Sequence, residues 1–162
     1  MTTDNKSPTR KHYRLPGYDY STPGAYFITI CTKNREHLLS TVTDGGFGNP
    51  PIIRLTPAGK AVENAIAAVS SHYKNVAVDK YAIMPNHVHI LFSIGCGAED
   101  GVSISRVIQH LKGAVTKAYG YAIWQEKSYD HVIRGKDDYK TRWKYIDDTP
   151  SNWLLHRDEY CE

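Results

Sequence analysis

The chain has few cysteines, no long apolar run and little net charge, and each of these absences excludes a class of protein. Its three cysteines are widely spaced and form no CxxC pair, which favours reduced thiols over a disulfide framework or a zinc ribbon. No apolar stretch approaches the ~20 residues of a membrane-spanning helix, and the polar N-terminus does not resemble a signal peptide. A net charge of +3 is too small to indicate a nucleic-acid partner by itself. We therefore expect a cytoplasmic protein without a membrane partner.

Length and composition predict a single folded domain. Hydrophobic residues make up 41% of the 162 positions and charged residues 23%, which is ordinary for a globular protein. Residues 1–12 are polar and include three basic side chains, so we expect them to form a mobile basic tail. Residues 13–162 are then expected to form one domain.

The spacing of apolar residues predicts an α+β fold. Aromatic and β-branched residues predict strands at 25–32, 52–55, 76–83 and 87–94. Helical spacing predicts one helix from Thr56-Pro57, a second from about Ser103 and a short final helix over 137–148 that stops before Pro150. Residues 121–133 are expected to be extended. Hairpin-linked strands interrupted by helices suit a ferredoxin-like sandwich, in which helices pack on one face of an antiparallel sheet.

The most informative motif is MPNHVH at residues 84–89, which runs directly into an apolar strand. Side chains alternate faces along a strand, so His87 and His89 share one face, while Val88, Ile90 and Phe92 take the other. Two imidazoles ~7 Å apart along a strand can lean towards one divalent metal ion. The alternative interpretation is that one or both are hydrogen-bonded core histidines.

The predicted final helix contains a candidate nucleophile. Its packing stripe is predicted to be Tyr139, Arg142, Trp143 and Ile146, at i, i+3, i+4 and i+7. Tyr145 lies about 100° around the axis from Ile146, among polar and cationic neighbours, and can present its hydroxyl to a substrate. The alternative is an ordinary surface tyrosine, because the chain has twelve tyrosines.

Five collinear blocks of the sequence resemble the REP-associated tyrosine transposases, over about residues 13–153. The blocks are residues 14–32, 84–89, 111–117 and 129–134, and Tyr145-Ile146 followed by Pro150 and Trp153. The resemblance implies the one-tyrosine branch of the HUH endonucleases, which are single-strand DNA transposases on a ferredoxin-like fold.

The resemblance also implies a chemistry. Such an enzyme cleaves and rejoins single-stranded, hairpin or repetitive palindromic DNA through a 5′-phosphotyrosine intermediate. By the resemblance, Tyr145 is the nucleophile, and His87 and His89 hold a divalent metal ion, Mg²⁺ or Mn²⁺. Tyr139 is the second choice of nucleophile, but it lies on the predicted packing stripe. The DNA-bound protein could be a monomer or a homodimer.

The chain departs from the family at one position. The family usually has an amide side chain four residues after the nucleophile, where Thr149 stands here. A threonine hydroxyl is a poorer ligand for a hard cation than an amide oxygen, and Asp148 could substitute for it. His131 could be a third ligand, a phosphate contact or a structural hydrogen-bonding residue.

The same residues argue against two other classes of enzyme. A His-triad hydrolase needs a third histidine near position 91, and a metallo-β-lactamase-type site needs acidic and histidine ligands just after His89, where the residues are apolar. One alternative remains open: a domesticated module that binds structured single-stranded DNA or RNA without cutting it. The side chains predicted to contact the nucleic-acid backbone are Lys112, Lys117, Arg134 and Arg142.

Overall fold

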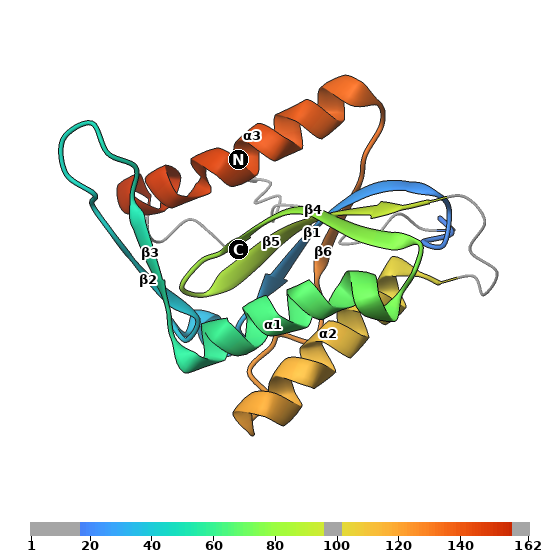
Figure 1. Cartoon of the computed structure of the whole chain (residues 1–162), viewed down its shortest axis with the longest axis horizontal. Coiled ribbons are helices and arrows are strands. Elements are labelled where there is room, and N and C mark those ends of the chain that lie inside the picture. Colours follow the sequence, from blue (N-terminus) through green and yellow to red (C-terminus); the bar gives the residue numbers. More distant parts are fainter. Residues whose placement is uncertain (1–16, 96–101, 157–162) are drawn as a thin grey trace, which may run out of the picture.

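A four-stranded antiparallel sheet organises the computed structural model, which describes residues 17–95 and 102–156 (Figure 1). Its strands, in spatial order, are β4 (Val76–Ile83), β5 (His87–Ile94), β1 (Gly24–Cys31) and β6 (Tyr129–Val132). The chain forms two strand–helix–strand units: the first leads from β1 through a helix to β4, and the second from β5 through a helix to β6. In the sheet, β5 lies between the two strands of the first unit, and β1 lies between the two strands of the second. This is the topology of a ferredoxin-like fold. The predicted tail, residues 1–12, lies outside the described residues.

Two capped helices cover one face of this sheet. Helix α1 (Pro57–His72) begins where the Thr56 hydroxyl accepts a hydrogen bond from the Gly59 amide, 3.1 Å away. Helix α2 (Ile104–Tyr119) begins in the same way, with Ser103 accepting from the Arg106 amide at 3.2 Å. These side-chain oxygens satisfy amides that the first helical turn leaves without a partner.

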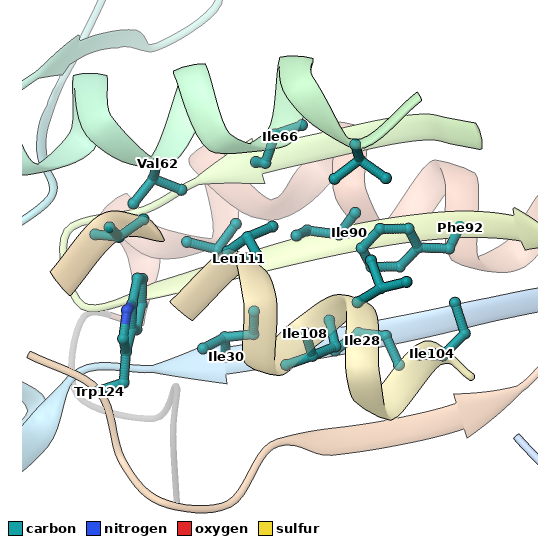
Figure 2. Packing of buried hydrophobic residues seen from close by; sticks show 14 of the residues in the cluster. Ile28, Ile30, Val62, Ile66, Ile90, Phe92, Ile104, Ile108, Leu111 and Trp124 are labelled. Atoms are coloured by element: carbon teal, nitrogen blue, oxygen red, sulfur yellow. The ribbon is translucent and has the colours of Figure 1, made fainter. Parts of the chain in front are cut away.

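The main core lies between the sheet and these two helices (Figure 2). The apolar face of β5 packs here, as its alternation predicts, together with residues from β1 and from both helices. Members of the cluster include Ile28, Ile30, Val62, Ile66, Val88, Ile90, Phe92, Val107 and Leu111.

Helix α3 (Lys136–Leu155) crosses the opposite face of the sheet (Figure 1). It covers a smaller cluster that includes Phe27, Met84, Leu91, Ile146 and Trp153. The predicted α+β fold class is therefore confirmed. The expected placement of helices on one face holds for α1 and α2, whereas α3 forms a third layer on the other side.

The final helix does not stop before Pro150, as the sequence predicted, but continues to Leu155. Proline has no amide hydrogen to donate to the carbonyl of Ile146, which normally weakens a helix interior. Beyond Pro150, however, the helix buries Trp153, which is only 3% exposed. Burial of this indole against the sheet offsets the missing hydrogen bond.

Two smaller differences concern the strands. A separate hairpin of β2 (Ser40–Thr43) and β3 (Ile52–Leu55) contains one strand that the sequence did not predict. Within the extended segment 121–133, only β6 is a strand of the main sheet, and Trp124 makes a single bridge to Thr32. No helix in the described part of the chain is both long and apolar enough to span a bilayer.

Candidate active site

The two histidines of β5 lie on the sheet face that α3 crosses. In the pairing with β1, His87 is opposite Cys31 and His89 is opposite Thr29. Their ring centroids are 4.6 Å apart, and both side chains are buried. The imidazoles therefore share a face, as the strand alternation predicts.

Hydrogen bonds orient both imidazole rings. Nδ1 of His87 lies 2.7 Å from the side-chain oxygen of Asn86, which can only accept, so this nitrogen carries the proton. Nδ1 of His89 lies 2.8 Å from the Thr29 hydroxyl. Nε2 of His89 is buried and has no hydrogen-bond partner among the described residues. Such Nδ1 contacts are typical of metal-ligating histidines, because they leave the Nε2 lone pair for the ion.

Both histidines are held in the neutral form. Burial lowers the pKa of His87 to about 3. Burial, followed by electrostatic interactions with His87 and with the Arg142 cation, lowers the pKa of His89 well below its usual value. A neutral imidazole is the form that binds a metal ion.

The buried His87 should make stability depend on pH. Its pKa rises from about 3 in the folded chain to ~6.5 on unfolding, so the unfolded state binds the extra proton between these values. The free energy of unfolding should fall as pH falls through this window, by about 2 kcal/mol at pH 5 from His87 alone. Urea denaturation at pH 7 and pH 5, in a chelator, measures the loss.

The His87→Gln variant should lose less stability between the two pH values than the wild type. Replacement of the exposed His72 by glutamine is the matched control and should leave the difference unchanged. If His87→Gln shows the full wild-type pH dependence, His87 is not the buried neutral group described above.

Tyr145 is the tyrosine of α3 that lies beside the histidines. Its ring centroid is 5.3 Å from that of His89 and 5.7 Å from that of Phe27, and the residue is half-buried. The packing stripe of α3 therefore differs from the predicted one: Thr149 and Trp153 are buried, whereas Trp143 is 38% exposed.

Tyr139 has a different environment. Its hydroxyl donates to Oδ2 of Asp79 at 2.8 Å, and Asp79 also accepts from Ser93. Burial, together with the Asp79 carboxylate, raises the pKa of Tyr139 to about 12. Its phenolate is thus harder to form, and the hydroxyl tethers the first half of α3 to β4.

The two residues considered as additional ligands lie in different environments. Thr149 is fully buried, and its hydroxyl donates to the Tyr145 carbonyl at 2.6 Å. The oxygen lone pairs of Thr149 remain able to bind a cation. The carboxylate of Asp148 pairs with Lys144 at 3.1 Å, and its side chain is 49% exposed. The Asp148 carboxylate is thus engaged by a lysine of its own helix at the surface.

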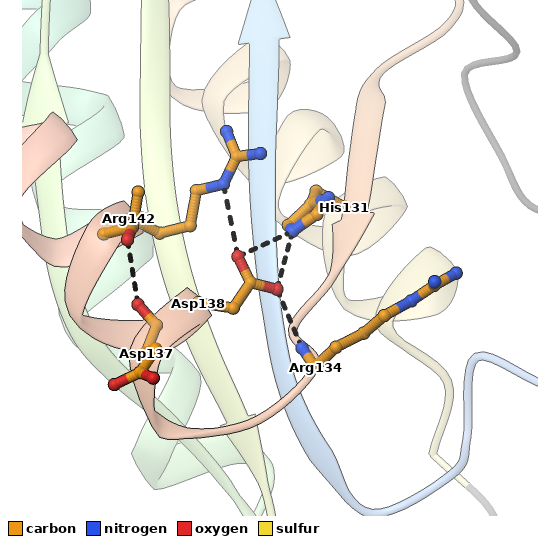
Figure 3. A network of polar contacts seen from close by, with 6 residues as sticks. His131, Arg134, Asp137, Asp138 and Arg142 are labelled. Atoms are coloured by element: carbon orange, nitrogen blue, oxygen red, sulfur yellow. Dashed lines mark hydrogen bonds and ion pairs between the residues drawn. The ribbon is translucent and has the colours of Figure 1, made fainter.

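A second polar group is centred on Asp138 (Figure 3). The carboxylate of Asp138 accepts from Nε2 of His131 at 2.9 Å and from the Arg134 amide at 2.8 Å, and lies 3.8 Å from Nε of Arg142. Burial opposes its ionisation, but these hydrogen bonds and the Arg142 charge together lower the pKa of Asp138. His131 is thus occupied by Asp138.

Arg142 extends from this group towards the candidate site. Its guanidinium carbon lies 5.2 Å from the centroid of the Phe27 ring, and the same ring stacks on His89 at 5.2 Å. The Asp138 carboxylate forms an ion pair with Arg142 at 3.8 Å, but Nε of Arg142 has no hydrogen-bond partner among the described residues. An arginine next to the buried histidines can bind an anion through its guanidinium nitrogens.

The sequence comparison matches a family to most of the chain. The sequence model described as "Transposase IS200 like" matches residues 22–149. The chain belongs to the IS200-like transposases. It is also 28% identical over 167 residues to an uncharacterized protein of Haemophilus influenzae, with 89% of each chain covered. It is 27% identical over 128 residues to the REP-associated tyrosine transposase of Escherichia coli, covering 78% of this chain and 66% of that protein.

Solved structures show the same fold. A REP-associated tyrosine transposase bound to a REP hairpin superposes with a TM-score of 0.65 at 23% identity, covering 86% of this chain and 73% of that one. A putative transposase from Deinococcus radiodurans gives a TM-score of 0.50 at 14% identity, covering 83% and 97%.

The four basic residues predicted to bind DNA lie on two sides of this IS200-like transposase. Arg142 lies at the candidate site, whereas Arg134 is exposed and its side chain points away from Arg142, on the other side of Asp138 (Figure 3). Lys112 and Lys117 belong to α2, on the opposite face of the sheet. The ammonium group of Lys112 donates to the carbonyls of Gln125 and Glu126.

Several residues around the site were not singled out from the sequence of this IS200-like transposase. Thr29 and Phe27 contact His89, and Asp138 orients Arg142. Trp153 packs its ring 5.9 Å from that of His87. The alternation of β1 places Phe27 and Thr29 on one face, but no local signal gives the register that sets Thr29 opposite His89.

Proposed function

We propose that the chain is a metal-dependent single-strand DNA endonuclease and strand transferase that uses Tyr145 as its nucleophile. The observation that carries the proposal is the contact between the Tyr145 ring and the buried His89 ring, 5.3 Å apart. A half-buried phenol beside two neutral imidazoles and the Arg142 guanidinium is a suitable arrangement for attack on a phosphodiester.

In the proposed reaction, the Tyr145 oxygen forms a bond to phosphorus and the bond from phosphorus to the 3′ oxygen breaks. The phenol proton is lost, the leaving oxygen gains a proton, and a free 3′-hydroxyl and a 5′-phosphotyrosine result. Attack of a second 3′-hydroxyl on the phosphotyrosine reverses these steps. The phosphotyrosine bond conserves the energy of the original diester, so rejoining requires no nucleotide triphosphate.

The donor atoms near Tyr145 fit a divalent cation in part. His87 and His89 would bind it through Nε2, and the Thr149 hydroxyl, water and phosphate oxygens could supply the remaining ligands. A bound Mg²⁺ or Mn²⁺ would polarise the phosphate and offset its negative charge. Imidazole suits Mn²⁺ better than Mg²⁺, whose preferred ligands are oxygens, so we expect stronger activity with Mn²⁺.

Arg142 would bind a non-bridging oxygen of the attacked phosphate, with the Asp138 carboxylate as its ion-pair partner 3.8 Å away. Arg134 would contact the backbone of the flanking strand. Lys112 and Lys117 face away from Tyr145, so they could contact only DNA that continues around the molecule. These assignments follow the general use of arginine for phosphate recognition.

Hairpin DNA is the proposed substrate, supported by the solved relative that is bound to a REP hairpin. A hairpin with single-stranded flanks should bind at least ~10-fold more tightly than a blunt duplex of the same sequence, and binding should weaken with salt. Fluorescence anisotropy at two salt concentrations measures both effects, and Arg142→Ala should reduce the salt slope by about 1. Equal affinity for the blunt duplex would count against the proposal.

A second candidate function is binding of structured single-stranded DNA or RNA without cleavage. One observation favours it: among the described residues, no group of three or more His, Cys, Asp or Glu side chains is placed to hold a metal ion. The two functions differ in one result. The binding module predicts hairpin affinity with no covalent adduct in either Mg²⁺ or Mn²⁺.

A further inference from the structure

A second pair of histidines lies on the face of the molecule opposite Tyr145. His72 is the last residue of α1, and His110 lies in the first half of α2, where the two helices run side by side (Figure 1). Their ring centroids are only 4.4 Å apart, with an angle of 68° between the ring planes. Both residues are exposed, so an ion from solution can reach them.

The spacing of these rings is close to that of two imidazoles bound to one metal ion. With metal–nitrogen distances of about 2.1 Å and bond angles between a right angle and the tetrahedral value, ring centroids would lie about 4.6–5.3 Å apart. The observed 4.4 Å is slightly shorter than this range, so the two rings would move apart a little to hold one ion.

Tyr73 adds a polar contact that such a site uses. Its hydroxyl lies 2.9 Å from Nδ1 of His110. With the hydroxyl oxygen as acceptor, Nδ1 carries the proton and the Nε2 lone pair is left for a metal ion. The Tyr73 ring also packs against the His72 ring at 4.8 Å, which restricts the position of that side chain.

The surroundings of the pair also favour a cation. The C-terminal end of α1 carries the negative end of the helix dipole, and His72 is at this end. An apolar cavity of about 130 Å³, lined in part by Ala65, Val69 and Leu111, adjoins the rings. A nearby apolar surface strengthens electrostatic interactions at its edge.

We propose that His72 and His110 bind one Zn²⁺ ion, which links the end of α1 to α2. Water would complete the coordination. Imidazole pairs select Zn²⁺ or Cu²⁺ over Mg²⁺. By holding two helices together, the ion would stabilise the folded chain in proportion to its saturation.

Calorimetric titration with ZnCl₂ tests the proposal on the untagged full chain. In a His87→Ala/His89→Ala background, which removes the other histidine pair, one Zn²⁺ should still bind. Adding either His72→Gln or His110→Gln should weaken that event at least ~10-fold, because one ligand is lost, and Tyr73→Phe should weaken it less. His156→Gln is the matched control and should leave it unchanged.

The His87→Ala/His89→Ala variant could fail to fold, so the titration is repeated in a chain that keeps both of these histidines. There, His110→Gln should remove one equivalent of Zn²⁺ and the accompanying rise in melting temperature. Two results would overturn the proposal. One is unchanged Zn²⁺ stoichiometry and affinity in His110→Gln. The other is no Zn²⁺ binding to a His87→Ala/His89→Ala chain that circular dichroism shows to be folded. Neither result bears on Tyr145, so the two proposals fail independently.

Discussion

Tyr145→Phe should reduce cleavage of a hairpin with single-stranded flanks by at least ~10³-fold, because it removes the oxygen that would attack the phosphate. The ring that packs against His89 and Phe27 is kept, so the free energy of unfolding should change by less than about 1 kcal/mol. Hairpin affinity should persist. Single-turnover cleavage of an end-labelled oligonucleotide, in Mg²⁺ and in Mn²⁺, gives the rate.

Tyr139→Phe is the control for this variant. It removes a hydroxyl from the same helix, but one that donates to Asp79. It should cost some stability, because the Asp79 carboxylate loses a partner, and should retain cleavage within about tenfold of the wild type. Cleavage that persists in Tyr145→Phe and disappears in Tyr139→Phe would show that Tyr139 is the nucleophile.

His89→Gln should reduce the cleavage rate at saturating DNA by at least ~100-fold. The variant keeps most of the side-chain volume but replaces the buried Nε2, which has no hydrogen-bond partner in the described residues. The metal concentration needed for half-maximal cleavage should rise, while DNA affinity without metal should stay the same. Cleavage rates measured over a series of Mn²⁺ concentrations separate these effects.

His156→Gln is the matched control for His89→Gln, since His156 is exposed at the C-terminal end of α3. It should leave the Mn²⁺ dependence of cleavage unchanged. Wild-type rates and wild-type metal dependence in His89→Gln would show that the β5 histidines are core residues, the alternative that the sequence left open.

Much of the fold could be predicted because its signals are local. The alternation of β5 separated the two histidines from the apolar residues Val88, Ile90 and Phe92, and these do pack in the main core. The Thr56-Pro57 start of α1 and the start of α2 after Ser103 were also confirmed. Capping and strand alternation depend on neighbouring residues, which a single sequence contains.

The contacts around the site depend on pairing between distant segments. Thr29 meets His89, 60 residues away, only through the register of β1 with β5. Pro150 misled the prediction of the last helix, because its local effect was outweighed by burial of Trp153. The prediction that Trp143 belongs to the packing stripe of α3 was also wrong. Helical spacing shows which residues share a face of the helix, but the side chains of the sheet decide which face of α3 is buried.

Peptide mapping of the covalent adduct tests the proposed nucleophile most directly. The wild-type chain would be incubated with Mn²⁺ and a hairpin oligonucleotide that is nicked close to the cleavage site. The short fragment that carries the free 3′-hydroxyl then diffuses away, so rejoining stops. After nuclease and protease digestion, mass spectrometry should find a phosphonucleotide on the peptide that contains Tyr145, attached to that side chain. A phosphonucleotide on another tyrosine, or no adduct when the same hairpin is bound, would contradict the account.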